Sequence, residues 1–431
     1  MQKRTKIFVW VILAICFLFI LRIWDYKGII VATILLFVIE IFLYFLINYL
    51  RKDFQWLITT ADETPKLSEE GLRKFFKNGF DPELGWVRKP NTQKDEPGKF
   101  GKTTYHIGKD GYRSNPGFES FPKIISCYGD SFTFARQVDD NQSWEWYLSE
   151  LTKSNVMNFG VGNYGLDQAL LRLKREFPKN RTKIVIMGVV PSTIVRILCL
   201  WKHYNEFGNT FGFKPMFYIR DNNLELIPNP IDKEEKFFHY WDYLDLIKKY
   251  DYFYERKFKR EMITFPYLIS ILTQPVRNFF LFYLLIKDKF FRSKQEMQDT
   301  EMYIEPMKVI MRINLKLRQK LFTEEEYPVA LMIRLLEEFV DLAKKEKFIP
   351  IFLMLPQKDD ILFMREKGLY YDKFVNVIKE KITTIDLTEN LLGRNDLDNI
   401  YSDDNEYGGH FSGEGNKIVA RFIFEKLNKY I

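Results

Sequence analysis

Five short apolar segments that alternate with helical segments constrain the fold of this chain of 431 residues more than any other feature. They span residues 123–128, 155–159, 183–190, 348–355 and 383–387. The third is apolar on both faces, as a central parallel strand should be. Strands separated by helices favour a parallel sheet with helices on both faces. We therefore predict an α/β fold, a flavodoxin-like three-layer α/β/α sandwich with a five-stranded parallel sheet.

The intervening segments show the apolar spacing of amphipathic helices. We expect helices over residues 143–151, 166–177, 327–345 and 371–381, and a final helix that begins after the cap Ser412 and runs to Asn428. Ligands bind such sheets beyond the carboxyl ends of the strands. The end of the first strand, at residue 128, is therefore the first place to look for chemistry.

Two apolar stretches, 7–21 and 28–50, precede this pattern. A membrane span needs about 20 residues. The second stretch is long enough, and the first is flanked by Lys6 and Arg22, whose side chains can reach the interface. A signal peptide is the alternative for the first stretch, but no small-residue cleavage site follows it. We predict a transmembrane helical hairpin over residues 1–52.

Charge gives this hairpin an orientation. Basic residues flank it at 3, 4, 6, 51 and 52, and two lie in its loop, at 22 and 27. The positive-inside rule then puts the soluble part on the cytoplasmic face of a membrane crossed by two helices. Glu40, inside the second span, indicates either contact with another helix, such as that of a membrane-protein partner, or a protonated carboxyl bonded within the hairpin.

The remaining chain divides in two. Residues 53–120 form a polar linker, with a short hairpin over 105–113 that turns at residues 109–111. Residues 121–431 form the α/β domain, interrupted by a helical insert at about 200–325, which is rich in aromatic and charged residues. We interpret the insert as a cap over the site. The alternative for its apolar part, 264–291, is a helix that rests on the membrane.

Composition excludes several classes of function. The net charge of +7 is mild and no basic patch is concentrated, so no nucleic-acid partner is expected. Three cysteines do not make a disulfide framework. No two of the four histidines have metal-ligand spacing, so no metal site is expected. No glycine pattern resembles a P-loop, and we expect no cofactor.

A serine and a histidine remain as candidates for chemistry. Ser131 follows Gly129 and Asp130 at the end of the first strand, and His410 lies in a polar loop before the last helix. A serine hydroxyl is a weak nucleophile until a base takes its proton, and histidine is the usual base. Because the next residues open a helical turn, the amide of Ser131 can face a developing negative charge.

Three sequence blocks resemble those of the SGNH/GDSL hydrolase family. They are CYGDSFT at 127–133, NFGVGNYG at 158–165 and GHFS at 409–412. The resemblance covers residues of about 100–200 and 325–431. It implies that Ser131 is the nucleophile and His410 the base. It also implies oxyanion donors at the amides of Ser131 and Asn163, the latter aligned with a family glycine and adjacent to Gly162.

The sequence departs from the family at two places. The family's third block supplies an asparagine as the remaining oxyanion donor, and here Thr193 or Ser192 occupies that place. The family also places an aspartate three residues before the histidine, where this chain has a tyrosine. Among the nearby carboxylates we favour Asp404 or Glu406 as the group that orients His410.

These observations predict a membrane-tethered serine esterase or O-acyltransferase that acts on acyl esters without a cofactor. The resemblance implies carbohydrates or cell-envelope polymers as substrates, because similar membrane-linked family members often act on their acyl groups. The departures motivate an alternative, a catalytically inactive fold that serves as a binding or scaffold module in a membrane assembly.

Overall fold

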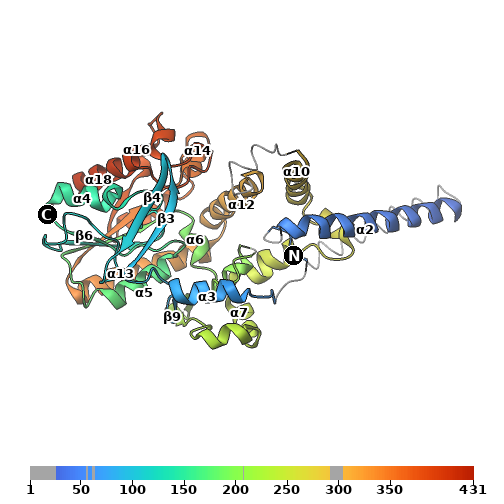
Figure 1. Cartoon of the computed structure of the whole chain (residues 1–431), viewed down its shortest axis with the longest axis horizontal. Helices are drawn as coiled ribbons and strands as arrows, with labels where there is room; N and C mark the ends of the chain where they lie inside the picture. Colours follow the sequence, from blue (N-terminus) through green and yellow to red (C-terminus); the bar gives the residue numbers. More distant parts are fainter. Residues whose placement is uncertain (1–25, 55–56, 61–63, 207, 292–303) are drawn as a thin grey trace. The chain divides into compact units, whose positions relative to one another are not determined.

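The computed structural model describes residues 26–54, 57–60, 64–206, 208–291 and 304–431 (Figure 1). Within these residues the chain divides into two compact units. The first unit draws on residues 1–67, 201–212 and 248–313. The second, which we call the α/β unit, comprises residues 68–200, 213–247 and 314–431. The predicted insert is therefore divided between both units.

The sheet of the α/β unit has five parallel strands, as predicted. They are β5 (Ile125–Gly129), β6 (Val156–Asn158), β7 (Ile184–Val189), β10 (Ile349–Met354) and β11 (Thr383–Asp386). Their order is β11-β10-β7-β5-β6. The first strand of the sheet thus lies between the second and the third, which is the flavodoxin-like order. The crevice between β5 and β7 is where such sheets bind ligands.

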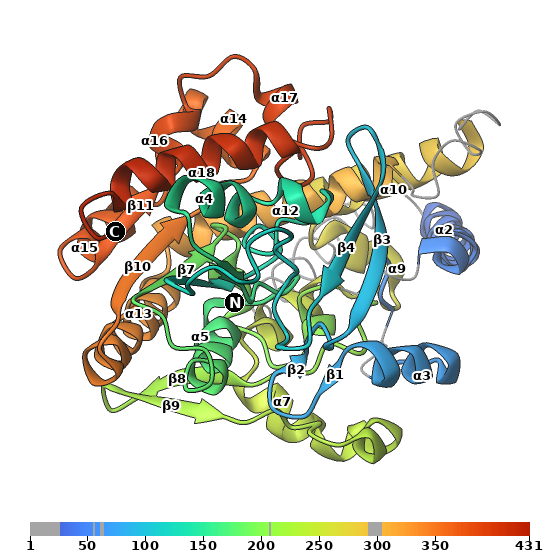
Figure 2. The same ribbon diagram turned by 60° about the vertical axis from the view of Figure 1, so that its left-hand side comes forward.

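Helices cover both faces of this sheet (Figure 2). On one face α4 (Trp144–Thr152) packs against α18 (Gly413–Leu427), and on the other α5 (Leu166–Glu176) packs against α13 (Glu326–Glu346). Ser143 and Ser412 cap α4 and α18 through side-chain hydrogen bonds. These helices and α15 (Asp372–Lys379) confirm the predicted ones to within a residue or two. Further helices lie at the carboxyl edge of the sheet or after it in sequence: α6 (Thr193–Arg196), α14 (Lys358–Lys367), α16 (Thr388–Leu391) and α17 (Leu397–Ile400).

The linker contains a longer hairpin that precedes the predicted one. Its strands are β3 (Thr92–Gly98) and β4 (Gly101–Ile107), which follow α3 (Glu69–Asn78) and the short pair β1 (Phe80–Asp81) and β2 (Gly85–Trp86). Glycine decides where the chain turns, because a Cβ on Gly98 would lie 2.5 Å from the Thr103 side chain. The chain also reverses at the predicted turn, where an isolated bridge joins Ile107 and Arg113 and the Gly108 N–H donates to the Tyr112 carbonyl at 2.9 Å.

The insert is not wholly helical, which corrects the sequence interpretation. In the α/β unit, β8 (Met216–Arg220) and β9 (Asn223–Ile227) form an antiparallel hairpin. Its two-residue turn, Asp221 and Asn222, has positive φ at both positions, the conformation that such tight hairpins require. Helical elements fill the rest: η3 (Glu234–Tyr243), α7 (Leu244–Tyr250), η4 (Tyr254–Phe258), α8 (Lys259–Glu261), α9 (Tyr267–Leu272), α10 (Pro275–Phe291) and α12 (Ile304–Thr323).

In the first unit, α2 (Tyr26–Phe54) contains, over Lys27–Asp53, the described segment that is long and apolar enough to cross a membrane. The first stretch of the predicted hairpin and most of its loop lie outside the described residues. The C-terminal part of α2 packs with α9 and α10 around a buried apolar cluster that includes Ile47, Leu50 and Leu285. The Glu40 carboxylate accepts the amide N–H groups of Tyr267 and Leu268, at 2.7 and 2.9 Å. It therefore binds the start of α9, which agrees with the predicted contact with another helix, although that helix belongs to this chain.

Candidate active site

Asp130 fixes the turn that carries Ser131. Its carboxylate is fully buried and accepts the amide N–H of Phe132 at 2.9 Å. It also accepts the amide N–H of Val190 at 3.0 Å and Arg196 Nη1 at 2.9 Å. Because Val190 directly follows β7, one carboxylate joins the ends of the first and third strands. Ser131, 7 % exposed, is thereby held at the carboxyl edge of the sheet, beside the predicted ligand crevice.

Glycine is required where this turn meets its neighbours. A Cβ on Gly129 would lie 1.8 Å from the carbonyl oxygen of Gly188 on β7. A Cβ on Gly160, in the loop after β6, would lie 2.4 Å from the backbone nitrogen of Phe134. Asn158 fastens the same two loops, since its Nδ2 donates to the Thr133 carbonyl at 2.9 Å. The glycines of the first two sequence blocks therefore permit close approach of backbone to backbone.

Three amides in these loops are available to a ligand. Within the described part of the chain, the backbone N–H groups of Ser131, Gly162 and Asn163 donate no hydrogen bond. Asn163 is exposed and has a φ of +65°, a left-handed conformation that asparagine tolerates. Unpaired amides at the carboxyl edge of a sheet are suited to bind an anion. These are the donors that the sequence predicted for an oxyanion.

The two predicted hydroxyl donors have partners within the protein. Thr193 is fully buried, and its Oγ1 accepts the amide N–H of Leu166, the first residue of α5, at 2.9 Å. Ser192 Oγ donates to Gln357 Oε1 at 3.1 Å. Thr193 thus contributes to the start of α5, and Ser192 is tied to the loop after β10. An oxyanion role for either stays a prediction.

The segment after Ser131 is wrapped around one buried arginine. Arg113, 1 % exposed, donates from Nη1 to the carbonyls of Phe134 and Ala135 and from Nη2 to that of Val138. Its Nε pairs with Asp140 at 2.9 Å. Ala135 and Gln137, at φ values of +56° and +66°, are held in a backbone conformation that costs free energy in non-glycine residues. The hydrogen bonds from Arg113 stabilise the loop against this cost.

This loop places Gln137 against His410. Gln137 Oε1 lies 3.0 Å from the backbone nitrogen of His410 and 2.6 Å from its Nδ1. A backbone N–H can only donate, so the Gln137 atom that faces it must be the amide oxygen rather than the amide nitrogen. The same oxygen can only accept, so Nδ1 carries the imidazole proton. The neutral imidazole therefore presents Nε2 as its basic atom.

Gln137, and not the predicted Asp404, accepts the hydrogen bond of His410 Nδ1. Asp404 is exposed, and its carboxylate pairs with Lys99 of the β3–β4 turn at 2.9 Å. Lys358 Nζ donates to the carbonyl of Asp404 at 3.0 Å and so fixes the same loop from its other side. Glu406 also lies in this exposed loop, and its predicted role was neither supported nor excluded by a contact.

The imidazole of His410 is packed against the residue that follows Ser131. The ring centroids of Phe132 and His410 lie 4.9 Å apart. Desolvation is the main cause that lowers the pKa of His410 well below its usual value, and the charges of Arg136, Arg196 and Arg88 lower it further. The imidazole is therefore neutral at physiological pH. Within the described residues no hydrogen bond joins Ser131 Oγ to it, and the pairing of these two groups stays a prediction.

Sequence reasoning missed two residues of this region. Gln137 follows the first sequence block in a segment without a strand or helix pattern, and only the tight loop brings it to His410. Arg88 lies in the polar linker, where a charged residue is expected on the surface, yet its charge lowers the pKa of His410. Gln137 adopts a left-handed backbone conformation, and no local sequence rule predicts that conformation for a glutamine.

No protein-family model matches the chain, and no curated protein is significantly similar to it in sequence. Solved structures of similar fold include a lipase/acylhydrolase from Enterococcus faecalis, with 12 % identity over 72 % of this chain and 96 % of that one and a TM-score of 0.33. A lipolytic protein of the G-D-S-L family from Desulfitobacterium hafniense has 12 % identity over 71 % and 99 % of the two chains, with a TM-score of 0.31. The esterase EstA from Pseudoalteromonas has 11 % identity over 72 % and 98 %, with a TM-score of 0.29. The function is argued below from the site itself.

Proposed function

We propose that this chain is a serine esterase or O-acyltransferase of the SGNH type. Ser131 Oγ attacks the carbonyl carbon of an acyl ester while Nε2 of His410 takes its proton. The oxyanion that forms is stabilised by the amides of Ser131, Gly162 and Asn163. The C–O bond to the alcohol then breaks, and the imidazolium returns the proton to the leaving oxygen. Water or an acceptor hydroxyl releases the acyl group from Ser131 by the reverse steps.

The observation that best supports this proposal is the hydrogen bonding of His410. A general base needs an unprotonated nitrogen at working pH and a fixed ring. Gln137 supplies both conditions, because its oxygen selects the Nδ1–H tautomer and holds the ring from behind. A histidine that merely packed the last helix would not need this arrangement. An amide in place of the family's aspartate leaves the imidazolium without a neutralising carboxylate, so the enzyme should be slower than one with a full triad.

A fluorophosphonate probe tests the proposal, because it reacts only with an activated serine. The full chain in detergent should be labelled at Ser131, and Ser131→Ala should abolish both labelling and hydrolysis of p-nitrophenyl acetate. Ser126→Ala is a matched control, since Ser126 is buried in β5 and bonds Thr182 at 2.8 Å. A folded protein without labelling at Ser131 would instead support the scaffold function.

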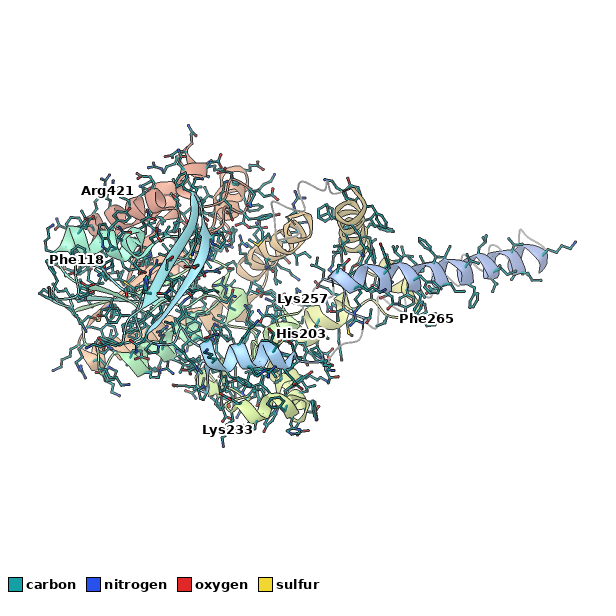
Figure 3. The ribbon with its side chains drawn as sticks, in the orientation of Figure 1. Phe118, His203, Lys233, Lys257, Phe265 and Arg421 are labelled. Carbon is teal, nitrogen blue, oxygen red and sulfur yellow. The ribbon has the colours of Figure 1, made fainter. Side chains whose placement is uncertain are left out.

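The proposal includes a tether to the bilayer through the first unit. Large apolar side chains are exposed along α2, such as Phe37 and Phe45 at 67 and 66 %. Others are exposed just before α9, at Phe265 with 71 % (Figure 3), and on α10, at Val276 with 80 % and Tyr283 with 63 %. Together with the packing of α10 against α2, this favours the membrane-resting interpretation of the apolar insert segment. Charge around the predicted hairpin favours the cytoplasmic face.

The substrate class follows from the resemblance and is proposed as such. Acyl groups on carbohydrates or cell-envelope polymers would reach a site held close to the bilayer by this tether. Hydrolysis of p-nitrophenyl acetate in the presence of increasing amounts of an alcohol acceptor separates the two reactions. A transferase should acylate the alcohol more often than the molar fraction of alcohol in the solvent predicts. An esterase should instead release mainly acetate.

A further inference from the structure

Arg88 is a fixed cation at the edge of the proposed site. It follows β2, and its guanidinium carbon lies 3.8 Å from the centre of the Phe134 ring and 4.5 Å from that of Tyr105. Nη1 donates to the Tyr105 hydroxyl. The two rings and this hydrogen bond hold the planar guanidinium in one orientation. Arg88 is only half-buried, so a ligand can reach it.

The other arginines of this region form salt bridges with carboxylates, whereas Arg88 interacts only at longer range with the charge of Glu96, which already pairs with Arg136. Arg196 pairs with Asp130, and Arg136 pairs with Glu96, each at 2.9 Å. Among the described residues no carboxylate lies within salt-bridge distance of Arg88, and its buried Nε has no hydrogen-bond partner. A partly desolvated cation that lacks a carboxylate of its own is a suitable partner for an anionic ligand.

The protonation states of Arg88 and Tyr105 keep a charged guanidinium beside a neutral hydroxyl. Burial lowers the pKa of Arg88 to about 10, so the guanidinium still carries its proton at neutral pH. Burial raises the pKa of Tyr105, so its hydroxyl stays neutral. The cation therefore remains available to an anion over the whole physiological range of pH.

Arg88 also lies next to the loop that carries the proposed oxyanion donors. A Cβ on Gly162 would lie 3.9 Å from Arg88 Nη2. Trp86, two residues before Arg88, donates from Nε1 to the Gly162 carbonyl at 2.9 Å, which ties the two segments together. A group bound by Nη2 would thus sit beside an ester carbonyl held at the amides of this loop.

We propose that Arg88 binds a carboxylate or phosphate that the substrate carries close to its scissile acyl ester. The inference rests on the proposed function and adds that the substrate is anionic. The guanidinium N–H groups at Nη2 can form charge-assisted hydrogen bonds with either oxyanion. The carboxylate of an acidic sugar and the phosphate of a polymer present the same chemistry to it. A permanent charge on the protein is matched by a permanent charge on the ligand.

A pair of esters that differ only in charge tests the proposal. We expect kcat/KM at pH 8 to be roughly 10- to 100-fold higher for 4-acetoxybenzoate than for its neutral methyl ester, the gain that a hydrogen bond to a charged group gives. Arg88→Met should bring this ratio close to one, and Arg88→Lys should retain part of it. Arg421→Gln, which removes an equal charge from the exposed face of α18 (Figure 3), should leave the ratio unchanged.

Equal loss of kcat for both esters in Arg88→Met, with the ratio retained, would overturn the proposal and assign Arg88 to the oxyanion instead. Binding is measured separately from turnover by calorimetric titration of the Ser131→Ala protein with benzoate and with phenyl phosphate. Binding that Arg88→Met abolishes supports the anion site even if no variant shows esterase activity. Absence of binding to both ligands refutes it, and the preferred ligand indicates the kind of anion.

Discussion

Replacement of Gln137 by methionine tests the assignment of the base most directly. The substitution keeps the length of the side chain and removes the oxygen that faces His410. The backbone N–H of His410 keeps a partner, because it also donates to Ser402 Oγ at 3.0 Å. Ser402 Oγ and the Pro97 carbonyl also lose a hydrogen bond to Gln137, of 3.0 and 3.4 Å, but within the imidazole the group left without a partner is Nδ1–H. In the transition state the imidazole is charged, and a hydrogen bond to a charged group contributes about 1.5–3 kcal/mol.

This free energy corresponds to a loss of roughly 10- to 150-fold in kcat. KM for p-nitrophenyl acetate should change little, since Gln137 acts through His410 and has no proposed contact with substrate. Gln137→Glu should act in the opposite direction. A carboxylate behind Nδ1 raises the pKa of His410, so the acid limb of the pH profile should move upward while kcat is kept or increased.

The assay is steady-state hydrolysis at pH 8, where the imidazole is neutral in every variant, followed by a pH profile. Gln93→Met is the control, because Gln93 is an exposed residue on β3. If Gln137→Met retained the full kcat of a protein whose activity depends on Ser131, then the hydrogen bond to Nδ1 would have no part in catalysis. The tautomer argument would then be wrong.

Four further predictions follow from described contacts. Because the lowered pKa keeps His410 neutral, kcat/KM should stay on its plateau below pH 6.5 and fall only in more acidic buffer; a limb at or above pH 6.5 would contradict the desolvation of the ring. Burial raises the pKa of Glu145, so the folded state holds this proton more tightly, and stability should fall as pH rises above 4.5; Glu145→Gln should reduce that fall in melting temperatures taken between pH 5 and 8. Arg113→Met should destabilise the α/β unit by about 3–5 kcal/mol in urea unfolding, because Asp140 loses a buried partner; an effect near zero would show that the loop around Ser131 is held by other contacts. Phe279→Trp on α10, 58 % exposed, should gain fluorescence that brominated lipids quench, whereas Phe100→Trp at the tip of the β3–β4 hairpin should not.

The sheet could be predicted from the sequence because its signals are local. Each of the five strands is a short apolar run between a helix and a turn, and the cap Ser412 marks the start of the last helix. Ser131 was placed by the rule that ligands bind at the carboxyl edge of parallel strands. The β8–β9 hairpin was missed because the aromatic residues around it obscured a turn whose only mark is Asp221-Asn222.

The surroundings of His410 could not be predicted, because they depend on contacts between distant segments. A carboxylate close in sequence was the natural choice, and Asp404 was favoured for that reason. The structure pairs Asp404 with Lys99, more distant by far along the chain, and brings Gln137 to the imidazole through a left-handed loop. Arg88 was hidden for a similar reason, since its two aromatic neighbours come from β4 and from the loop after Ser131.

The loop around Arg113 has a consequence for how such a chain can vary. Ser131 and Gln137 are the two ends of a seven-residue piece folded about one internal guanidinium. The relation of the proposed nucleophile to the proposed base would thus be set by Gln137 within that piece and by the short loop that ends at His410. Insertions elsewhere between the two, including the long one that spreads over both units, can lengthen or shorten without disturbing this alignment. Natural or engineered relatives should therefore tolerate large differences there and almost none between Ser131 and Gln137.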